Sequence, residues 1–194
     1  MGLSQRLIRP ILITARMTTT TWLRFTWDLT KVPTSGSEIP APYQLRDATA
    51  EEEDVIQKVT YSAFSMDSGW GNLQSPFVEN IRKQVAAAFE KDARSRCLAL
   101  LHGSRIIGAS VLSLEDGAVN NLVTGPCILH EYRSRSLGTH VLQASLLALR
   151  EAGLKRAFGV TREKTITARF IYPKFGGVSE PWAPDSESAP KIAA

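Results

Sequence analysis

A short segment between residues 125 and 140 constrains the fold of this chain more than any other part of it. An apolar run ends at Leu129, a turn rich in arginine and serine follows, and a helical pattern begins at Leu137. The N–H groups at a helix N-terminus have no partner within the helix and favour a bound anion. Gly138 lets a ligand approach the backbone because it carries no Cβ, and arginine side chains match phosphate oxygens. We therefore expect a pyrophosphate-binding turn made of Arg133, Ser134, Arg135, Ser136, Leu137, Gly138 and Thr139.

The elements predicted around this turn follow a simple order along the chain. Short apolar or alternating runs predict strands, and apolar residues at helical spacing predict helices. Thr49 is a good helix N-cap with Glu52 at the capping-box position, Gly153 suits a helix C-cap, and Pro173 ends the last helix. The expected strands span residues 43–48, 97–102, 105–115, 119–127 and 156–161, and the expected helices begin after Thr49 and span 77–91, 137–152 and 165–172.

The first helix is expected to bury one apolar face against a sheet. Val55, Ile56, Val59 and Ala63 recur at the spacing of a helical face. The stretch 67–76 that follows is rich in Gly, Ser and Pro and is predicted to form a loop that holds a tryptophan.

This order of elements predicts a mixed α+β fold. The strands before the long helix follow one another through short turns, so that they are expected to be antiparallel. A helix that connects two strands of one sheet makes them parallel, which is the expectation for the strands on either side of residues 137–152. We therefore expect a mostly antiparallel sheet with one parallel pair and with helices on both faces.

Composition narrows the classes of protein to which the chain can belong. The 194 residues, of which 43% are hydrophobic, fit a soluble domain with tails. The net charge of +4 comes without a basic stripe interleaved with aromatic residues, so that no nucleic-acid partner is expected. No apolar run approaches the roughly 20 residues of a membrane span, and no membrane partner is expected. Cys97, Cys127 and the three histidines show no ligand spacing, which predicts no metal site and reduced, buried thiols.

The ends of the chain differ in composition from its centre. The first 27 residues contain four arginines and neither Asp nor Glu, a composition shared with organelle transit peptides, although translation from Met17 would explain the same pattern. We expect a cytoplasmic protein, or an organellar one if this segment is a transit peptide. The predicted organisation is an N-terminal extension over 1–42, with an accessory strand at 22–29 and a linker from Val32, a domain over 43–182, and a disordered tail over 183–194.

Two motifs resemble those of the GNAT superfamily of N-acyltransferases, over residues 43–177. The family's phosphate-loop pattern is Gln/Arg-x-x-Gly-x-Gly/Ala, and residues 133–138 read Arg-Ser-Arg-Ser-Leu-Gly, with Ser136 in place of the first glycine. The family's second pattern is Asn-x-x-Ala-x-x-hydrophobic-Tyr followed by Gly-Phe. Residues matching that pattern are Ala168, Tyr172 and Gly176, while Thr165 stands in place of asparagine and Gly177 in place of phenylalanine.

The resemblance implies transfer of an acetyl group from acetyl-CoA to an amine, directly within a ternary complex. The acceptor would be a small-molecule amine or a protein amine, and the chain would act as a monomer or a homodimer. In the family's pattern, Tyr172 is the proton donor for the leaving thiolate. The alternative interpretation is that Tyr172 only packs the helix against the sheet. The cofactor's pantetheine arm would pair with the strand edge at Leu122, Val123, Thr124 and Gly125, with Val123 or Thr124 as oxyanion donor and with Thr165 and Ala168 beside the cofactor.

Several assignments stay open at this level. No base is singled out among Glu115, Asp116, His130 and Glu131. Residues Asp67 and Trp70 are similar to the family's substrate-side loop, or they pack that loop. The family usually completes its sheet with two strands after the short helix, whereas only 18 residues follow Gly176 here. One edge strand over 175–182 is expected, and the strand 22–29 or a partner chain would fill the vacant place. A non-catalytic coenzyme-A-binding module and a regulatory protein for another phosphate ligand are the alternative functions.

Overall fold

The computed structural model describes residues 21–183 apart from residues 37 and 92, and the side chains of residues 71–78 are not described. Residues 1–20 of the predicted transit-peptide segment (1–27) and residues 184–194 of the predicted tail (183–194) lie outside the described residues. The strands are β1 (Trp22–Asp28), β2 (Tyr43–Asp47), β3 (Ser95–His102), β4 (Arg105–Ser113), β5 (Cys127–Ile128), β6 (Arg156–Arg162) and β7 (Val178–Trp182). The α-helices are α1 (Glu53–Ser65), α2 (Gln74–Ala88) and α3 (Leu137–Glu151).

The first sheet has the strand order β2-β3-β4-β5, and each neighbouring pair is antiparallel. Its centre is the hairpin of β3 and β4, as the sequence predicts. Alternation along β4 places Ala109 and Val111 in the core under α1 and α2, whereas Leu112 belongs to the core under α3. Ser110 also faces α3, where its hydroxyl lies 2.9 Å from that of Ser145. The expected helices on both faces are therefore confirmed.

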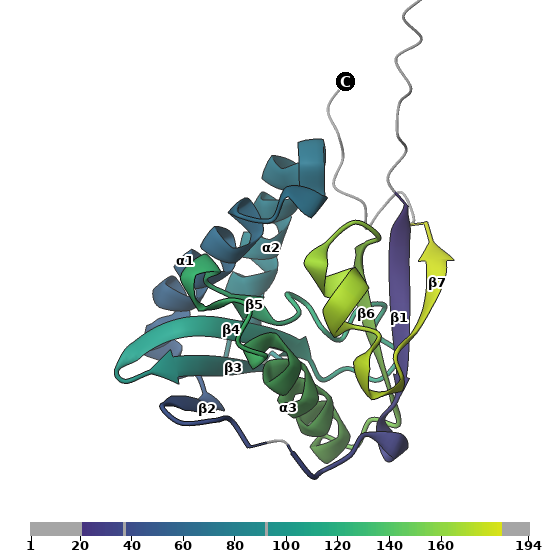
Figure 1. The fold of residues 1–194 in the computed structure, drawn as a ribbon, viewed down its shortest axis with the longest axis horizontal. Helices are drawn as coiled ribbons and strands as arrows, with labels where there is room; N and C mark the ends of the chain where they lie inside the picture. Colours follow the sequence, from purple (N-terminus) through teal and green to yellow (C-terminus); the bar gives the residue numbers. More distant parts are fainter. Residues whose placement is uncertain (1–20, 37, 92, 184–194) are drawn as a thin grey trace, which may run out of the picture.

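The second sheet has the order β6-β1-β7, with β1 antiparallel to both neighbours. Figure 1 shows β1 between β6 and β7, on the far side of α3 from α1 and α2. Phe25 pairs with Gly159 of β6 and with Ser179 of β7. The strand predicted over 22–29 thus fills the vacant place beside β6, and the expected edge strand near the C-terminus is present as β7. These residues precede the domain expected to begin at residue 43, and the second sheet is built on them.

The strand predicted over 119–127 is wrong, because only Cys127–Ile128 pairs as a strand. Side chains take the hydrogen bonds that a ladder would use. The Asn120 and Asn121 side-chain oxygens accept from the N–H groups of Val160 and Phe158, at 3.1 and 3.0 Å. Gly125 then adopts a left-handed φ of 60°, which turns the chain before Pro126.

The parallel pair expected on either side of α3 is also absent from the described part of the chain. β5 and β6 belong to different sheets, and each strand pairing is antiparallel. The segment between β4 and β5 joins the two sheets instead, since the N–H groups of Asn121 and Leu122 both donate to the Phe158 carbonyl at 2.8 and 3.0 Å. The two sheets are therefore linked through the bend between β4 and β5 and not through a parallel strand pair.

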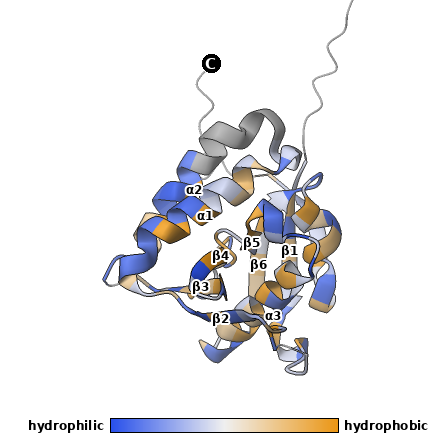
Figure 2. Ribbon diagram, turned by 60° about the vertical axis from the view of Figure 1, so that its left-hand side comes forward, coloured by the Kyte–Doolittle hydropathy of each residue, from blue (hydrophilic) through white to orange (hydrophobic). Residues whose placement is uncertain are grey.

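The helices follow the sequence prediction closely. The capping box is formed, with the Thr49 N–H donating to Glu52 at 2.9 Å. Val55 is an exception to the predicted apolar face, because its side chain is 41% exposed while Ile56 and Val59 are buried. Figure 2 shows that α3, which packs against both sheets, is hydrophobic along much of its length. It ends before Gly153, whose φ of 94° is the left-handed conformation expected of a C-cap.

The predicted loop over 67–76 is partly helical. A short 3-10 helix spans Ser68–Leu73 and leads directly into α2, which begins three residues earlier than expected. The last predicted helix is present as a π-helical turn over Thr167–Ile171, with the Tyr172 N–H donating to the Thr167 carbonyl at 2.9 Å. Among the described residues, no helix is both long and apolar enough to cross a membrane.

Candidate functional site

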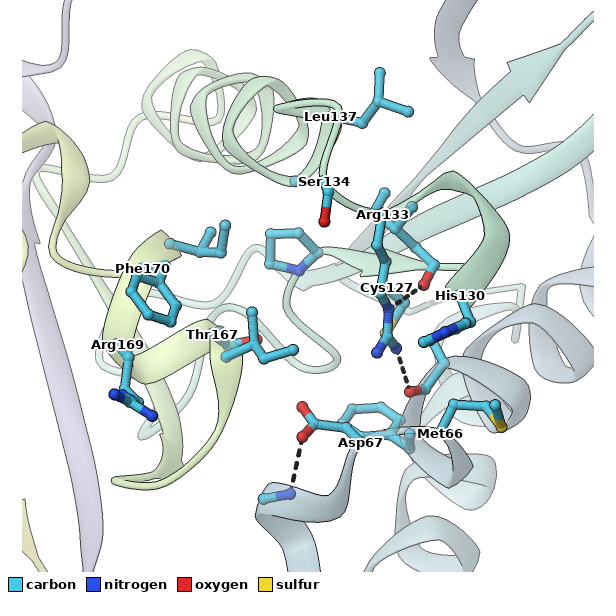
Figure 3. Close-up of a pocket in the computed structure, with 18 of the residues that line it drawn as sticks. Met66, Asp67, Cys127, His130, Arg133, Ser134, Leu137, Thr167, Arg169 and Phe170 are labelled. Carbon is cyan, nitrogen blue, oxygen red and sulfur yellow. Dashed lines mark hydrogen bonds between the residues drawn. The ribbon is translucent and has the colours of Figure 1, made fainter.

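A cavity of about 790 Å³ lies where four segments of the chain meet. Figure 3 shows the side chains that surround it. They come from the end of α1 and the following turn (63–70), the bend before β5 (124–128), the loop before α3 (130–138) and the π-helical turn (164–171). The first and last segments touch closely, because a Cβ added at Gly69 would lie 2.7 Å from the Thr165 Cα. The cavity therefore lies between the two sheets, at the N-terminus of α3.

The loop before α3 lines this cavity and contains a row of free N–H groups. Ser134 and Ser136 have left-handed φ values of 62° and 60°. The N–H groups of residues 134–138 donate to no acceptor in the described part of the chain, whereas those of Thr139 and His140 donate to the Ser136 carbonyl at 3.0 and 3.3 Å. Left-handed residues in such a turn can direct successive N–H groups to one side, as in the concavities that bind anions. The predicted turn thus combines two left-handed residues with a row of free N–H groups.

The two arginines of the loop are tied to other parts of the protein. Arg133 lines the cavity, and its guanidinium donates to the Ile128 carbonyl at 3.1 Å and to the Ala63 carbonyl at 2.7 Å. Arg135 is not among the lining residues, because its guanidinium donates to the Tyr43 hydroxyl at 2.8 Å and lies over the Tyr132 ring. Arg133 therefore joins the loop to α1 and β5, and Arg135 joins it to β2.

Tyr172 lies in the core beneath this site. It is 2% exposed, and its ring makes edge contacts with Phe25 and Trp27 at centroid distances of 5.3 and 5.1 Å. Its hydroxyl lies directly against the Gly125 backbone and has no hydrogen-bond partner among residues 21–183 as described. Burial, with a smaller contribution from nearby Cys127, raises the pKa of Tyr172 far above its usual value. The structure thus realises the packing role of Tyr172 and buries its hydroxyl at the bend.

Solved structures share this arrangement of elements, although no protein-family model and no curated protein sequence matches the chain. A GCN5-related N-acetyltransferase from Sphaerobacter thermophilus is 13% identical, with a TM-score of 0.56 over 84% of this chain and 49% of that chain. A tandem GNAT protein from the clavulanic acid biosynthesis pathway is 17% identical, with a TM-score of 0.53 over 84% and 50%. A GCN5-related N-acetyltransferase from Kribbella flavida is 16% identical, with a TM-score of 0.50 over 84% and 55%.

The chain has the GNAT fold. It spans about half of the length of these three solved chains. The N-terminal strand β1 therefore belongs to a GNAT-like unit in which β6 and β7 lie on either side of it.

The other positions matched to the GNAT motifs stabilise the walls of the cavity. The Thr165 hydroxyl donates to the Arg162 carbonyl at 2.8 Å and accepts from the Ala168 N–H at 3.2 Å. Thr165 thus caps the π-helical turn where the family has asparagine. Thr165 and Ala168 are both buried and lie behind the lining residues Thr167 and Ile171.

The bend that was expected to bind the pantetheine arm as a strand edge has few free backbone groups. The Leu122 N–H donates to Phe158, the Thr124 N–H to Val111 at 3.5 Å, and the Gly125 N–H to the Leu122 carbonyl at 3.1 Å. The Val123 N–H donates to no acceptor in the described segments. Thr124 lines the cavity, and Leu122, Val123 and Gly125 do not.

Cys127 lies in the cavity wall at the same bend. Its thiol donates to the Thr124 carbonyl at 3.6 Å. Burial raises the pKa of Cys127 to about 12, against the lowering effects of the Thr124 hydrogen bond and of Arg133. The thiol therefore stays protonated at neutral pH and is a poor nucleophile.

Candidate bases lie in different places. Glu115 and Asp116 are in an exposed turn away from the cavity, and Glu131 forms an ion pair with Arg105 at 3.0 Å. His130 lines the cavity. Asp67 is the one carboxylate among the described lining residues.

The sequence analysis pointed to Asp67 in its loop, but it missed the lining residues Thr167, Phe170 and Ile171. The match to the second motif was the only sequence signal for these three residues.

Proposed function

We propose that this protein transfers an acetyl group from acetyl-CoA to an amine, directly within a ternary complex. The observation that carries the proposal is the row of free N–H groups at residues 134–138, in the loop that lines a cavity at the N-terminus of α3. Pyrophosphate is an anion suited to such a row, because the amides and the helix dipole act together. The alternation of left-handed residues in the loop supports the same ligand.

The residues present fit an acetyl-CoA site. The N–H groups of Ser134 to Gly138 would hold the pyrophosphate, and a Cβ added at Gly138 would lie 3.4 Å from the Ile171 side chain, so that glycine leaves more room at this part of the loop. Acetyl-CoA, when bound, would supply the thioester from which the acetyl group is transferred. The arginines of the loop contribute positive charge near the site while they keep the loop attached to its neighbours.

The groups for the transfer itself would come from the bend. Of the two expected oxyanion donors, the Val123 N–H is the free one, because the Thr124 N–H is directed to Val111, although only Thr124 lines the cavity. Tyr172 would donate a proton to the leaving sulfur through its hydroxyl at Gly125. Cys127 stays a thiol, which supports direct transfer over an acetylated cysteine.

One observation favours a second candidate function. Tyr172 is buried and is not among the residues that line the cavity, and its raised pKa makes it a weaker acid. A module that binds coenzyme A without turnover, or that binds another phosphate ligand in a regulatory role, would need the cradle and no proton donor. Tyr172→Phe separates these functions: an enzyme that uses the phenol loses about 10²-fold or more in turnover while its affinity for acetyl-CoA stays the same.

Calorimetric titration with acetyl-CoA and then with ADP tests the proposal. We expect acetyl-CoA to bind much more tightly than ADP, since only acetyl-CoA reaches from the loop to the bend. Gly138→Leu is the matched variant: it should weaken acetyl-CoA binding by about tenfold or more, whereas helix propensity keeps the fold stable. Unchanged affinity in Gly138→Leu would exclude the loop as the pyrophosphate site. No binding of acetyl-CoA to the wild-type protein would exclude the proposed reaction.

A further inference from the structure

The wall of the cavity opposite the phosphate loop carries the negative charge of Asp67, which is unpaired among the described residues. Asp67 Oδ1 accepts from the Gly69 N–H at 2.9 Å, which fixes the orientation of the carboxylate. Figure 3 shows this carboxylate directed toward the centre of the cavity, across from Ser134. Within the described residues, Asp67 forms no ion pair with any lysine, arginine or histidine. The other carboxylate oxygen therefore has no donor among the described residues.

The surroundings of Asp67 make this arrangement unusual. Among the other described lining residues, the charged or basic ones are His130, Arg133, Lys164 and Arg169, and none of them is acidic. These basic groups suit the phosphates of a cofactor, and a carboxylate beside them disfavours phosphate. The charge of Asp67 also contributes to the raised pKa of Cys127, so that it acts at the bend where transfer would take place. An ammonium group is the complement of such a carboxylate.

Apolar side chains surround the same cavity. Among the large hydrophobic residues that are more than a third exposed, Met66, Ile166 and Phe170 all line it, with exposed fractions of 55%, 48% and 59%. Met66 directly precedes Asp67, and Figure 3 places Phe170 on the other side of the cavity. Clustered exposed apolar groups mark a binding surface more often than scattered ones do. A ligand with a positive end and an apolar body would satisfy both features.

We propose that the acceptor is a small primary amine with an apolar body, whose ammonium group binds to Asp67 and whose body contacts Met66 and Phe170. The proposal rests on the proposed function, because it names the acceptor class for the same site. A cavity of about 790 Å³ has the size of a small-molecule site. Polyhydroxylated amines would leave hydroxyl groups against the apolar side chains.

Binding of model amines, measured by calorimetry with and without saturating coenzyme A, tests this proposal. The probes are phenethylamine, the neutral analogue 2-phenylethanol and the small amine ethylamine. We expect the wild-type protein to bind phenethylamine about tenfold more tightly than 2-phenylethanol. Asp67→Asn should remove this difference, and Asp116→Asn, an exposed aspartate in a turn outside the cavity, should leave it intact.

A second variant tests the contact between Met66 and the apolar body of the amine. Met66→Ser changes an exposed side chain that is not needed for the core, and it should weaken phenethylamine binding about threefold or more while leaving ethylamine unaffected. Equal binding of phenethylamine and 2-phenylethanol, or discrimination that survives Asp67→Asn in a folded protein, would overturn the proposal. Acetyl-CoA is titrated into the same preparations. Failure of acetyl-CoA to bind then counts against the proposed function alone, whereas loss of amine discrimination with acetyl-CoA bound counts against the acceptor site alone.

Discussion

The Tyr172 hydroxyl lies directly against Gly125, in the space that the side chain of any other residue would occupy. Gly125 has a left-handed φ of 60° and turns the chain before Pro126, so that the contact fixes the bend between the two sheets. Gly159 accommodates the ring of the same tyrosine, since a Cβ added there would lie 3.0 Å from the Tyr172 ring and from the Trp27 ring. The position of the phenol thus depends on glycines in two segments far apart in the sequence.

Gly125→Ala is expected to destabilise the protein for two separable reasons. The left-handed backbone costs about 1 kcal/mol for a residue with a Cβ, and the contact with Tyr172 adds about 1–3 kcal/mol of overpacking. Gly103 is a matched control, because its φ is also 60° and an added Cβ would meet nothing within 4 Å. Chemical unfolding of both variants measures the excess at Gly125.

Tyr172→Phe provides the second half of the same experiment. Without the hydroxyl, the steric part of the Gly125→Ala penalty should largely disappear, while the backbone part persists. Equal penalties for Gly125→Ala in the wild-type and Tyr172→Phe backgrounds would show that the hydroxyl does not occupy this space.

Local sequence signals predicted most elements because those elements depend on near neighbours. The capping box at Thr49, the apolar face of α3 and the left-handed Gly153 are all set within a few residues. The strand prediction for residues 119–127 was wrong because the apolar residues of this segment resemble a strand. In the structure, Asn120 and Asn121 form hydrogen bonds to β6, which lies almost forty residues later. Register between distant segments is tertiary information that periodicity does not carry.

Only the local part of the candidate site could be predicted from the sequence. The loop 133–138 was predicted because the residues of its motif are consecutive in the chain. The use of Arg133 to hold the Ala63 carbonyl, seventy residues earlier, has no local signal. The meeting of Asp67 with Phe170 across one cavity depends on how α1 and the π-helical turn pack. Residues that line opposite walls could therefore be named from the sequence only in part.

Ser136→Gly is expected to stabilise the protein by about 0.5–1 kcal/mol, because the strain of a left-handed serine exceeds the extra chain entropy of glycine. The N–H row is unchanged by this substitution, so that acetyl-CoA affinity should be kept. Ser62→Gly within α1 is the opposite control and should destabilise by a similar amount. A lower melting temperature for Ser136→Gly would mean that the serine side chain has a stabilising role that its contacts do not reveal.

Acid stability should depend on Glu52. Its carboxylate accepts from two Arg46 nitrogens at 2.8 and 2.6 Å and from the Thr49 N–H at 2.9 Å. The Arg46 hydrogen bonds, followed by the Thr49 bond, lower the pKa of Glu52 from 4.5 to about 2. A depressed folded-state pKa contributes stability above the unfolded pKa, and this contribution is lost as the pH falls from about 4.5 to about 2.

Glu52→Gln removes this titration. We expect the variant to be less stable at neutral pH and to lose less stability than the wild type as the pH falls through that window. Urea unfolding at several pH values checks both, with Glu115→Gln, which forms no ion pair among the described residues, as the control. Parallel pH profiles for Glu52→Gln and the wild type would contradict the assignment.

The position of β1 between β6 and β7 predicts that its buried side chains contribute strongly to stability. Trp27 is fully buried, its indole N–H donates to the Lys174 carbonyl at 3.0 Å, and its ring contacts Tyr172. Trp27→Ala should therefore cost about 3–5 kcal/mol, and much of the protein should unfold at moderate temperature. Trp182→Ala at the edge strand β7 is the matched control, because Trp182 is only partly buried and should cost far less. Thermal unfolding of both variants measures the two losses of stability. Equal losses would mean that β1 is an accessory strand, whereas a much larger loss for Trp27→Ala would mean that β1 belongs to the core that positions Tyr172.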